Sequence, residues 1–198
     1  MKVSKLEGIK LLNELGMPTV KLLDISGILN GQISIDEGIS VRLSPKSKLV
    51  KWNVGLPSIN RRTNIDEVRE FVERYQDDYL VFAHKSVRPQ SIGTLSKFPE
   101  SVVAETYKSY EDKGDGIIDN RVTVPMRGDK LFISKMELLK RDETDFNNFR
   151  KVLLYLNKIP FSEYETEYVI EDNNVVFMDF TVSDTRQYKI YDNIYGER

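Results

Sequence analysis

The chain has 198 residues, of which 40% are apolar and 30% are charged. It carries 29 basic and 31 acidic residues, and this net charge of −2 gives no electrostatic reason to expect binding to nucleic acid or to an anionic membrane. The absence of cysteine excludes disulfides, thiolate metal sites and cysteine nucleophiles. A single histidine, His84, excludes metal sites built from several histidines and leaves little room for a Ser-His-Asp triad.

The polar start, MKVSKLEGIK, lacks the apolar core of a signal peptide, and no apolar run approaches the length that spans a bilayer. We therefore expect a soluble, cytoplasmic protein. Its length suffices for one sizeable core or for two small lobes that share a cleft.

Three segments have the apolar spacing of helices. The first spans 7–15 and is followed by Gly16, a residue type that commonly ends helices. The second begins near Asn64, whose side chain can cap a helix. The third, 144–159, shows the clearest helical periodicity.

Short apolar or alternating segments between these helices predict strands. Their expected ranges are 20–25, 38–43, a segment within 45–64, 79–84, 101–107, 120–125, 131–139 and a hairpin over 164–184. Arg88, Pro89 and Gly93 indicate a loop, and EDKGDG indicates an acidic turn. Many short strands with about three helices favour an α+β fold over a regular βαβ winding.

The hairpin segment YETEYVIEDNNVVFMDFTVSD carries an acidic residue on each arm, Glu167 and Asp179. Directly opposed residues of an antiparallel pair share one face, so the loop length decides whether the two carboxylates meet. A three-residue loop at 172–174 places them opposite each other, and Asn readily adopts the left-handed conformation that such a loop needs. A two-residue loop at 172–173 places them on opposite faces.

Two opposed carboxylates cost on the order of 0.5–1 kcal/mol, and more where water is excluded. A positive group should compensate them, either a Lys or Arg or a hard divalent cation. Mg²⁺ prefers oxygen ligands and is commonly held by one or two carboxylates together with substrate phosphates. The hairpin by itself leaves two interpretations open, a solvated acidic pair beside a lysine and a magnesium site.

The hairpin resembles that of the nucleotide-binding region of phosphoenolpyruvate synthase and pyruvate phosphate dikinase, in which a Glu precedes the Gln of a Gln-x-Arg signature. Glu167 lies twelve positions before Asp179, as in that family. Three further segments follow in the family's order: GIKLLNELGMPTVKLLDI, ISVRLS, and SIGTLSKFPESVVAET with GIIDNRVTVP. The resemblance extends from Leu6 to about Thr181.

This resemblance implies a two-lobed ATP-grasp-like domain of the α+β class with mostly antiparallel sheets. It implies an N-terminal lobe over 1–85 and a C-terminal lobe over 86–198 that carries the hairpin. Mg-ATP would bind in the cleft between the lobes, with Glu167 and Asp179 as the metal ligands. The implied chemistry is phosphoryl transfer.

The resemblance also implies the nucleotide contacts. Arg42, within ISVRLS and shortly before Ser44-Pro45, would contact phosphate and act in catalysis, although it could equally be an ordinary surface arginine at a strand end. Backbone groups of Phe82, Ala83 and His84 would line adenine. Glu105 would lie behind the metal ligands, or else be a charge at a strand edge. A buried strand makes His84 a poor phosphoryl acceptor.

The sequence departs from the family at several positions. Glu7 stands where the family has a lysine, Asp179 replaces the Gln of the signature, and Thr181 replaces its Arg. The only histidine, in YLVFAH, lacks the motif of the family's phosphohistidine domain, so the resemblance implies an acceptor that is a small molecule or a separate phosphohistidine-domain protein. These losses also favour an alternative function, a degenerate non-catalytic scaffold that binds a protein partner.

Two further features have more than one interpretation. Basic residues could screen a triphosphate or simply be solvated; they are Lys46, Lys48, Lys51, Arg61 and Arg62. Tyrosines near the C-terminus could pack on the body or meet a partner; they are Tyr188, Tyr191 and Tyr195. No GxxxxGK[ST] motif occurs, so a P-loop nucleotide site is not expected.

Overall fold

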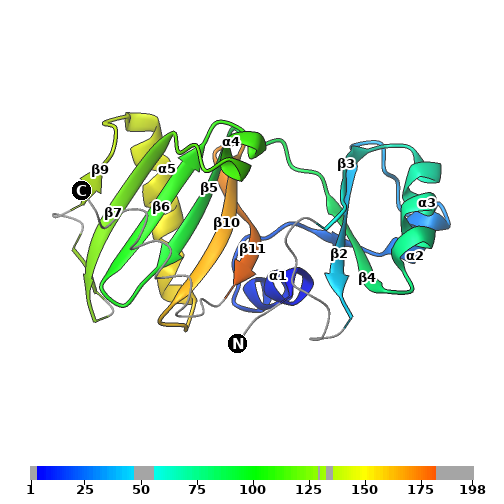
Figure 1. Ribbon diagram of the computed structural model, residues 1–198, viewed down its shortest axis with the longest axis horizontal. Coiled ribbons are helices and arrows are strands. Elements are labelled where there is room, and N and C mark those ends of the chain that lie inside the picture. The colour runs from blue at the N-terminus through cyan, green and yellow to red at the C-terminus, as the bar shows by residue number, and fades with distance from the viewer. Residues whose placement is uncertain (1–3, 47–55, 129, 133–135, 182–198) are drawn as a thin grey trace. The chain divides into compact units, whose positions relative to one another are not determined.

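The computed structural model describes residues 4–46, 56–128, 130–132 and 136–181. Within these residues the chain forms two compact units (Figure 1). The N-terminal unit comprises Ser4–Glu7 and Thr19–Arg88, and the C-terminal unit comprises Gly8–Pro18 and the described residues from Pro89 onward. In the described part of the chain, no helix is long and apolar enough to cross a membrane.

The N-terminal unit is a four-stranded antiparallel sheet packed against two helices. Its strands, in sheet order, are β1 (Leu22–Leu23), β4 (Tyr79–Lys85), β2 (Ile39–Pro45) and β3 (Ile59–Arg62). The helices are α2 (Ile25–Leu29) and α3 (Ile65–Tyr75). Val41 and Ala83, which pair across β2 and β4, pack in one core with Val68 and Phe71 of α3. Because side chains alternate along a strand, the residues next to them face the other side of the sheet.

Side-chain caps set where the helices of this unit begin. Asn64 accepts a hydrogen bond from the backbone N–H of Asp66 at 3.0 Å, so the predicted cap of α3 is confirmed. Asp24 accepts from two backbone N–H groups of α2. That cap starts a short helix which the sequence did not predict, and it limits the strand expected over 20–25 to two residues.

The C-terminal unit is a seven-stranded antiparallel sheet. The strand order is β11-β10-β5-β6-β7-β8, and β9 also pairs with β7. The strands are β5 (Ser91–Lys97), β6 (Ser101–Tyr107), β7 (Asn120–Arg127), β8 (Lys130–Leu131), β9 (Glu137–Leu138), β10 (Tyr164–Glu171) and β11 (Asn174–Thr181). Of the strand expected over 131–139, Leu131 belongs to β8 and Glu137–Leu138 form β9, whereas Phe132 and Met136 are not in a strand. Residues 133–135 lie outside the described residues.

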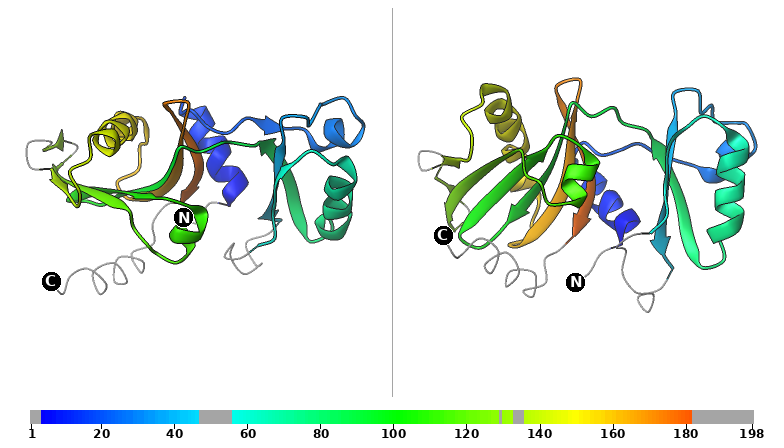
Figure 2. Two further views of the ribbon diagram at one scale, coloured as in Figure 1. Left: turned by 90° about the horizontal axis from the view of Figure 1, so that it is seen from above. Right: turned by 45° about the horizontal axis from the view of Figure 1, so that its top comes forward.

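Helices lie on both sides of this sheet (Figure 2). They are α1 (Lys5–Glu14), α4 (Tyr110–Gly114), α5 (Glu143–Leu153) and the 3-10 helix η2 (Leu156–Lys158). Phe149 and Val152 of α5 pack with Tyr168 and Phe177 in the core, and α4 lies on the opposite side of the sheet. The predicted α+β class is confirmed. The helix expected over 144–159 ends early, and α4 forms within the predicted acidic turn.

Gly93 lies inside β5 and not in the predicted loop. A Cβ atom at this position would lie 2.3 Å from Cζ of Tyr168 and 2.5 Å from the backbone oxygen of Glu105. Only glycine therefore allows the Tyr168 ring to cross β5 and to place its hydroxyl 3.3 Å from that same oxygen.

His84 is buried in β4, with 2% of its surface exposed. Nδ1 donates a hydrogen bond to the carbonyl oxygen of Lys85 at 2.9 Å. Burial lowers the pKa of His84 from 6.5 to about 4, with a smaller contribution from the positive charge of Arg42, although the hydrogen bond to Lys85 opposes the shift. The imidazole is therefore neutral in the folded protein at neutral pH.

We predict that Gly93→Ala lowers the free energy of unfolding by about 2–3 kcal/mol, because the Tyr168 ring and the β6 backbone must both move. Urea unfolding followed by circular dichroism measures the change. Gly114→Ala in α4 is the matched control, since a Cβ atom there meets nothing within 4 Å. Equal unfolding midpoints for the two variants would contradict the predicted contact.

We also predict a pH dependence that belongs to His84. The unfolded chain takes up this proton near pH 6.5 and the folded chain only near pH 4, so acidification between these values removes about 3 kcal/mol of stability. Because His84 is the only histidine of the sequence, His84→Phe should flatten this part of the stability profile. Parallel profiles for wild type and variant from pH 7 to pH 4 would refute the assignment.

Candidate functional site

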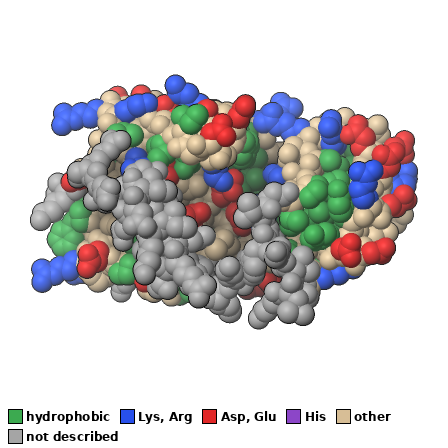
Figure 3. All heavy atoms as spheres, viewed as in Figure 1, with side chains coloured by type: hydrophobic (Ala, Val, Ile, Leu, Met, Phe, Trp, Pro, Cys, Tyr) green, Lys and Arg blue, Asp and Glu red, His purple; other side chains and the backbone are tan. Residues whose placement is uncertain are grey.

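One row of side chains crosses five strands of the C-terminal sheet. Asp179 pairs with Glu167, Glu167 with Thr94, Thr94 with Glu105, and Glu105 with Arg121. Directly paired residues share a face, so all five lie on the side of the sheet away from the α5 core. Acidic and basic side chains are both visible on this side (Figure 3). We call it the acidic face, after the carboxylates of Glu105, Glu165, Glu167 and Asp179.

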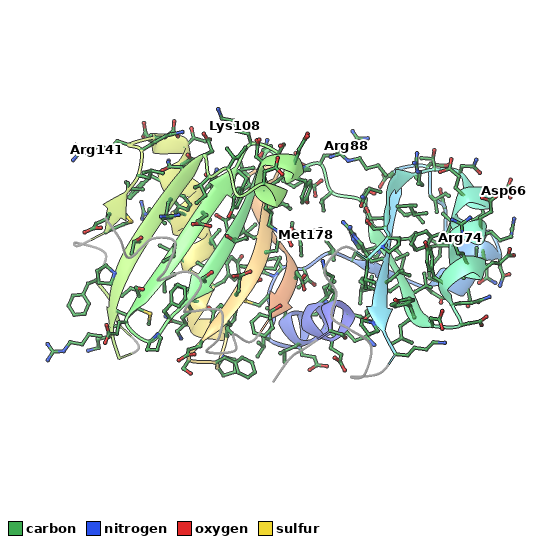
Figure 4. The ribbon with its side chains drawn as sticks, in the orientation of Figure 1. Asp66, Arg74, Arg88, Lys108, Arg141 and Met178 are labelled. Atoms are coloured by element: carbon green, nitrogen blue, oxygen red, sulfur yellow. The ribbon has the colours of Figure 1, made fainter. Side chains whose placement is uncertain are left out.

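The loop and the strand pairing that place the two acids opposite each other differ from those predicted. Its loop has two residues, Asp172 and Asn173, with φ of 49° and 63°, and not three. A two-residue loop alone would place Glu167 and Asp179 on opposite faces. A β-bulge at Met178, labelled in Figure 4, adds one unpaired residue to β11 and restores the opposition. The predicted pairing of the two acids is confirmed, and the predicted loop is wrong.

Lys113 of α4 forms an ion pair with Glu167, with Nζ 3.0 Å from Oε1. The two side chains are 26% and 19% exposed, so water screens the pair only in part. Asp179 accepts a hydrogen bond at Oδ1 from the backbone N–H of Phe180 at 2.8 Å, and its carbonyl oxygen accepts one from Thr166 at 2.6 Å. A lysine thus provides the expected positive group beside Glu167.

Carboxylate oxygens in this position fit the ligand preference of Mg²⁺. Across the described residues, no group of three or more His, Asp or Glu side chains gathers as a metal site. A magnesium ion held by Glu167 and Asp179 would therefore complete its coordination with water and phosphate oxygens, as Mg²⁺ commonly does in nucleotide sites.

Glu105 is buried, with 2% of its surface exposed, and has several hydrogen-bond partners. Oε1 accepts from Nε of Arg121 at 2.9 Å and lies 2.8 Å from Nη2 of the same guanidinium. Oε2 accepts from the hydroxyl of Tyr107 at 2.7 Å. Glu105 is thus well suited to orient neighbouring groups, and its predicted place near a nucleotide stays a prediction.

Glu165 belongs to the same face, although the sequence did not single it out. Burial raises its pKa, with smaller contributions from the negative charges of Glu105 and Glu167, while Lys113 and a hydrogen bond from Ser96 act in the opposite direction. The Ser96 hydroxyl lies 3.4 Å from Oε2. The alternation of acids with tyrosines in YETEY is the signal that indicates this position.

In the N-terminal unit, Arg42 pairs with Phe82, and Ser40 pairs with His84, all on the side of the sheet away from α3. Nη1 of Arg42 donates a hydrogen bond to the hydroxyl of Ser58 at 3.0 Å. Ala83 faces the core, so its side chain lies on the other side.

The backbone of β4 has few hydrogen-bonding groups left for a ligand, because neighbouring strands pair with it. Ala83 and His84 have strand partners on both sides, in β1 and β2. The Ala83 side chain faces the core and the His84 side chain is buried, so the expected adenine contacts of 82–84 stay predictions.

The described members of the basic cluster have protein partners. Lys46 donates to the carbonyl oxygen of Asp77 at 2.8 Å, Arg61 donates to that of Val87 at 3.3 Å, and Arg62 pairs with Glu67 at 2.9 Å. The predictions for Lys48, Lys51, Tyr188, Tyr191 and Tyr195 lie outside the described residues.

No protein-family model matches the chain, and no curated protein matches it. Solved structures do match. A dinucleotide-forming acetyl-coenzyme A synthetase chain from Ca. Korarchaeum cryptofilum, in complex with coenzyme A and Ca-AMPCP, is 11% identical with a TM-score of 0.58, and 91% of this chain covers 92% of that one. An Aspergillus clavatus N5-carboxyaminoimidazole synthase, in complex with ADP and 5-aminoimidazole ribonucleotide, is 13% identical with a TM-score of 0.54. The D-alanine-D-alanine ligase of Coxiella burnetii is 11% identical with a TM-score of 0.50.

The matched regions differ in extent. The alignments cover 95% and 90% of this chain but only 47% of the synthase and 47% of the ligase, so the chain spans about half their length. At identities this low the likeness concerns the fold. The similar structures have the ATP-grasp fold, and the fold of this chain is ATP-grasp-like.

Proposed function

We propose that this protein binds Mg-ATP through the acidic face of its C-terminal unit. The observation that carries the proposal is the direct opposition of Glu167 and Asp179 on one face of an ATP-grasp-like sheet. Two similar structures are complexes with ATP or ADP, which supports a nucleotide as the ligand. The metal would bind both carboxylates and use phosphate oxygens and water for its remaining ligands.

We assign separate roles to the other predicted residues. The Arg42 guanidinium, oriented by Ser58, is suited to a charge-assisted contact with phosphate. The segment Phe82–His84 is assigned to the base on the resemblance alone, because the side chains of Phe82 and His84 are both buried. Glu105 would act as a positioning residue, because Arg121 and Tyr107 hold its carboxylate.

The chemistry that we propose is phosphoryl transfer to an acceptor on another molecule. Positioning and charge stabilisation supply most of the catalysis in such reactions. His84 is buried, so we do not assign it as the acceptor. A separate phosphohistidine-domain protein, kinship to phosphoenolpyruvate synthase and a cytoplasmic location follow from the sequence and stay predictions.

One observation favours the second candidate function, a non-catalytic scaffold that binds a protein partner. Glu7, which stands where the resembled family has a lysine, accepts a hydrogen bond from the backbone N–H of Ser4 at 3.0 Å. The Ser4 hydroxyl in turn accepts one from the backbone N–H of Glu7 at 3.3 Å, which completes a capping box at the start of α1. This position therefore serves the helix start in place of a phosphate contact.

We predict that Mg-ATP at about a hundred times its dissociation constant stabilises the protein by about 2.7 kcal/mol. The Glu167→Ala/Asp179→Ala variant should lose this gain, because Mg²⁺ then lacks both of its proposed protein ligands. Thermal unfolding with ATP, with and without Mg²⁺, measures both effects.

Glu171→Ala is the matched control, since this acid lies on the same strand but pairs with Asn174 beside the turn. It should keep the full stabilisation. An unresponsive wild type would favour the scaffold, whereas a gain that survives the double substitution would remove the two acids from the metal site.

A further inference from the structure

The acidic face contains a lysine that stands where a bound metal would need room. We propose that Lys113 is a built-in counterion, which pairs with Glu167 while the site holds no metal and moves to the nucleotide phosphates when Mg-ATP binds. This inference rests on the proposed function and concerns the same site. It predicts that Lys113 weakens the binding of a free divalent cation and strengthens the binding of the metal–nucleotide complex.

The position of Lys113 is well defined by its neighbours. The residue lies in α4, which begins two residues after the end of β6. Ser109 caps this helix, because its hydroxyl accepts a hydrogen bond from the backbone N–H of Asp112 at 3.0 Å. Nζ lies 3.0 Å from Oε1 of Glu167. All of these residues belong to the C-terminal unit. The ion pair is therefore a local feature of that unit.

The charges on this face explain why a counterion is needed. Four carboxylates share the face, and the guanidinium of Arg121 is already bound to Glu105 by contacts of 2.9 and 2.8 Å. Glu165 and Glu167 alternate on β10 and point to the same side, and Asp179 lies opposite Glu167. Lys113 is the described lysine that forms an ion pair with one of these acids, Glu167.

A dication that bridges Glu167 and Asp179 would compete directly with this ammonium. Both would bind the Glu167 carboxylate, and two positive charges a few ångströms apart repel each other where water screens them poorly. A free metal ion must therefore displace Lys113 without compensation. A metal–ATP complex brings phosphate oxygens to the same place, and the long, flexible lysine stem lets the ammonium turn from Glu167 to them.

Lys113→Met tests this exchange, because methionine keeps an unbranched apolar stem without the charge. Mn²⁺ alone and Mn-ATP serve as probes in isothermal titration calorimetry with the full chain. We expect Mn²⁺ alone to bind at least about tenfold more tightly to the variant, and Mn-ATP to bind at least about tenfold more weakly. A side chain that only supports the fold would not change the two affinities in opposite directions.

Three variants serve as controls. Lys108→Met removes a lysine from the same connection, labelled in Figure 4, whose side chain is 74% exposed and lies 3.6 Å from Asp119; it should leave both affinities unchanged. Lys113→Arg should keep the wild-type order of affinities. Lys113→Met combined with Glu167→Gln should lose the tighter binding of Mn²⁺. Lys113→Gln replaces Lys113→Met if the latter fails to fold in thermal unfolding.

The possible outcomes distinguish a failure of the counterion role of Lys113 from a failure of the proposed Mg-ATP binding. If the wild type binds Mn-ATP but neutral Lys113 variants bind free Mn²⁺ no more tightly, the counterion role is wrong and the proposed function stands. If both affinities fall in these variants, Lys113 supports the fold and the exchange is refuted. If the wild type binds no Mn-ATP at all, the proposed function fails and the counterion inference fails with it.

Discussion

The candidate site depends on one constraint, the place of β10 between β5 and β11. Side chains alternate along a strand, so the two registers decide which residues of β10 reach the acidic face and which enter the core. Tyr168 enters the core and crosses β5 at Gly93, while Glu167 faces the other side. A shift of one residue in either register would bury the acid and expose the tyrosine. Packing in the core and the chemistry of the opposite face are therefore set together.

Much of the fold could be predicted from local signals. Apolar periodicity indicated α1, α3 and α5, and the Asn64 cap placed the start of α3. β5 was missed because Gly93 is also a turn signal, and only the ring of Tyr168, far away in sequence, explains a glycine there. The short helix α2 was missed because Asp24 could equally belong to a strand or a turn.

The candidate site was predicted in part. The opposition of Glu167 and Asp179 was expected from a three-residue loop, but it arises instead from a two-residue loop and a bulge at Met178. Methionine is an ordinary strand residue, so its type does not indicate a bulge. Arg121 contacts Glu105 because the two residues pair directly across β6 and β7. This pairing register depends on the whole connection between the two strands, and the residue types alone do not indicate it. Lys113 belonged to a segment that indicated only a turn, and its contact with Glu167 joins parts of the chain that are 54 positions apart.

The bulge at Met178 also restricts how this hairpin can change during evolution. Four residues separate Glu167 from the turn and five separate the turn from Asp179, and this unequal count is what turns both acids the same way. Losing or gaining one residue within either arm reverses that parity, whereas a residue added to the turn itself leaves the pairing of the arms unchanged. Homologous chains that retain the paired acids should therefore vary in the length of the turn more freely than in the length of the arms. A single residue lost from one arm would identify a homologue in which one acid has turned inward and the pair no longer exists.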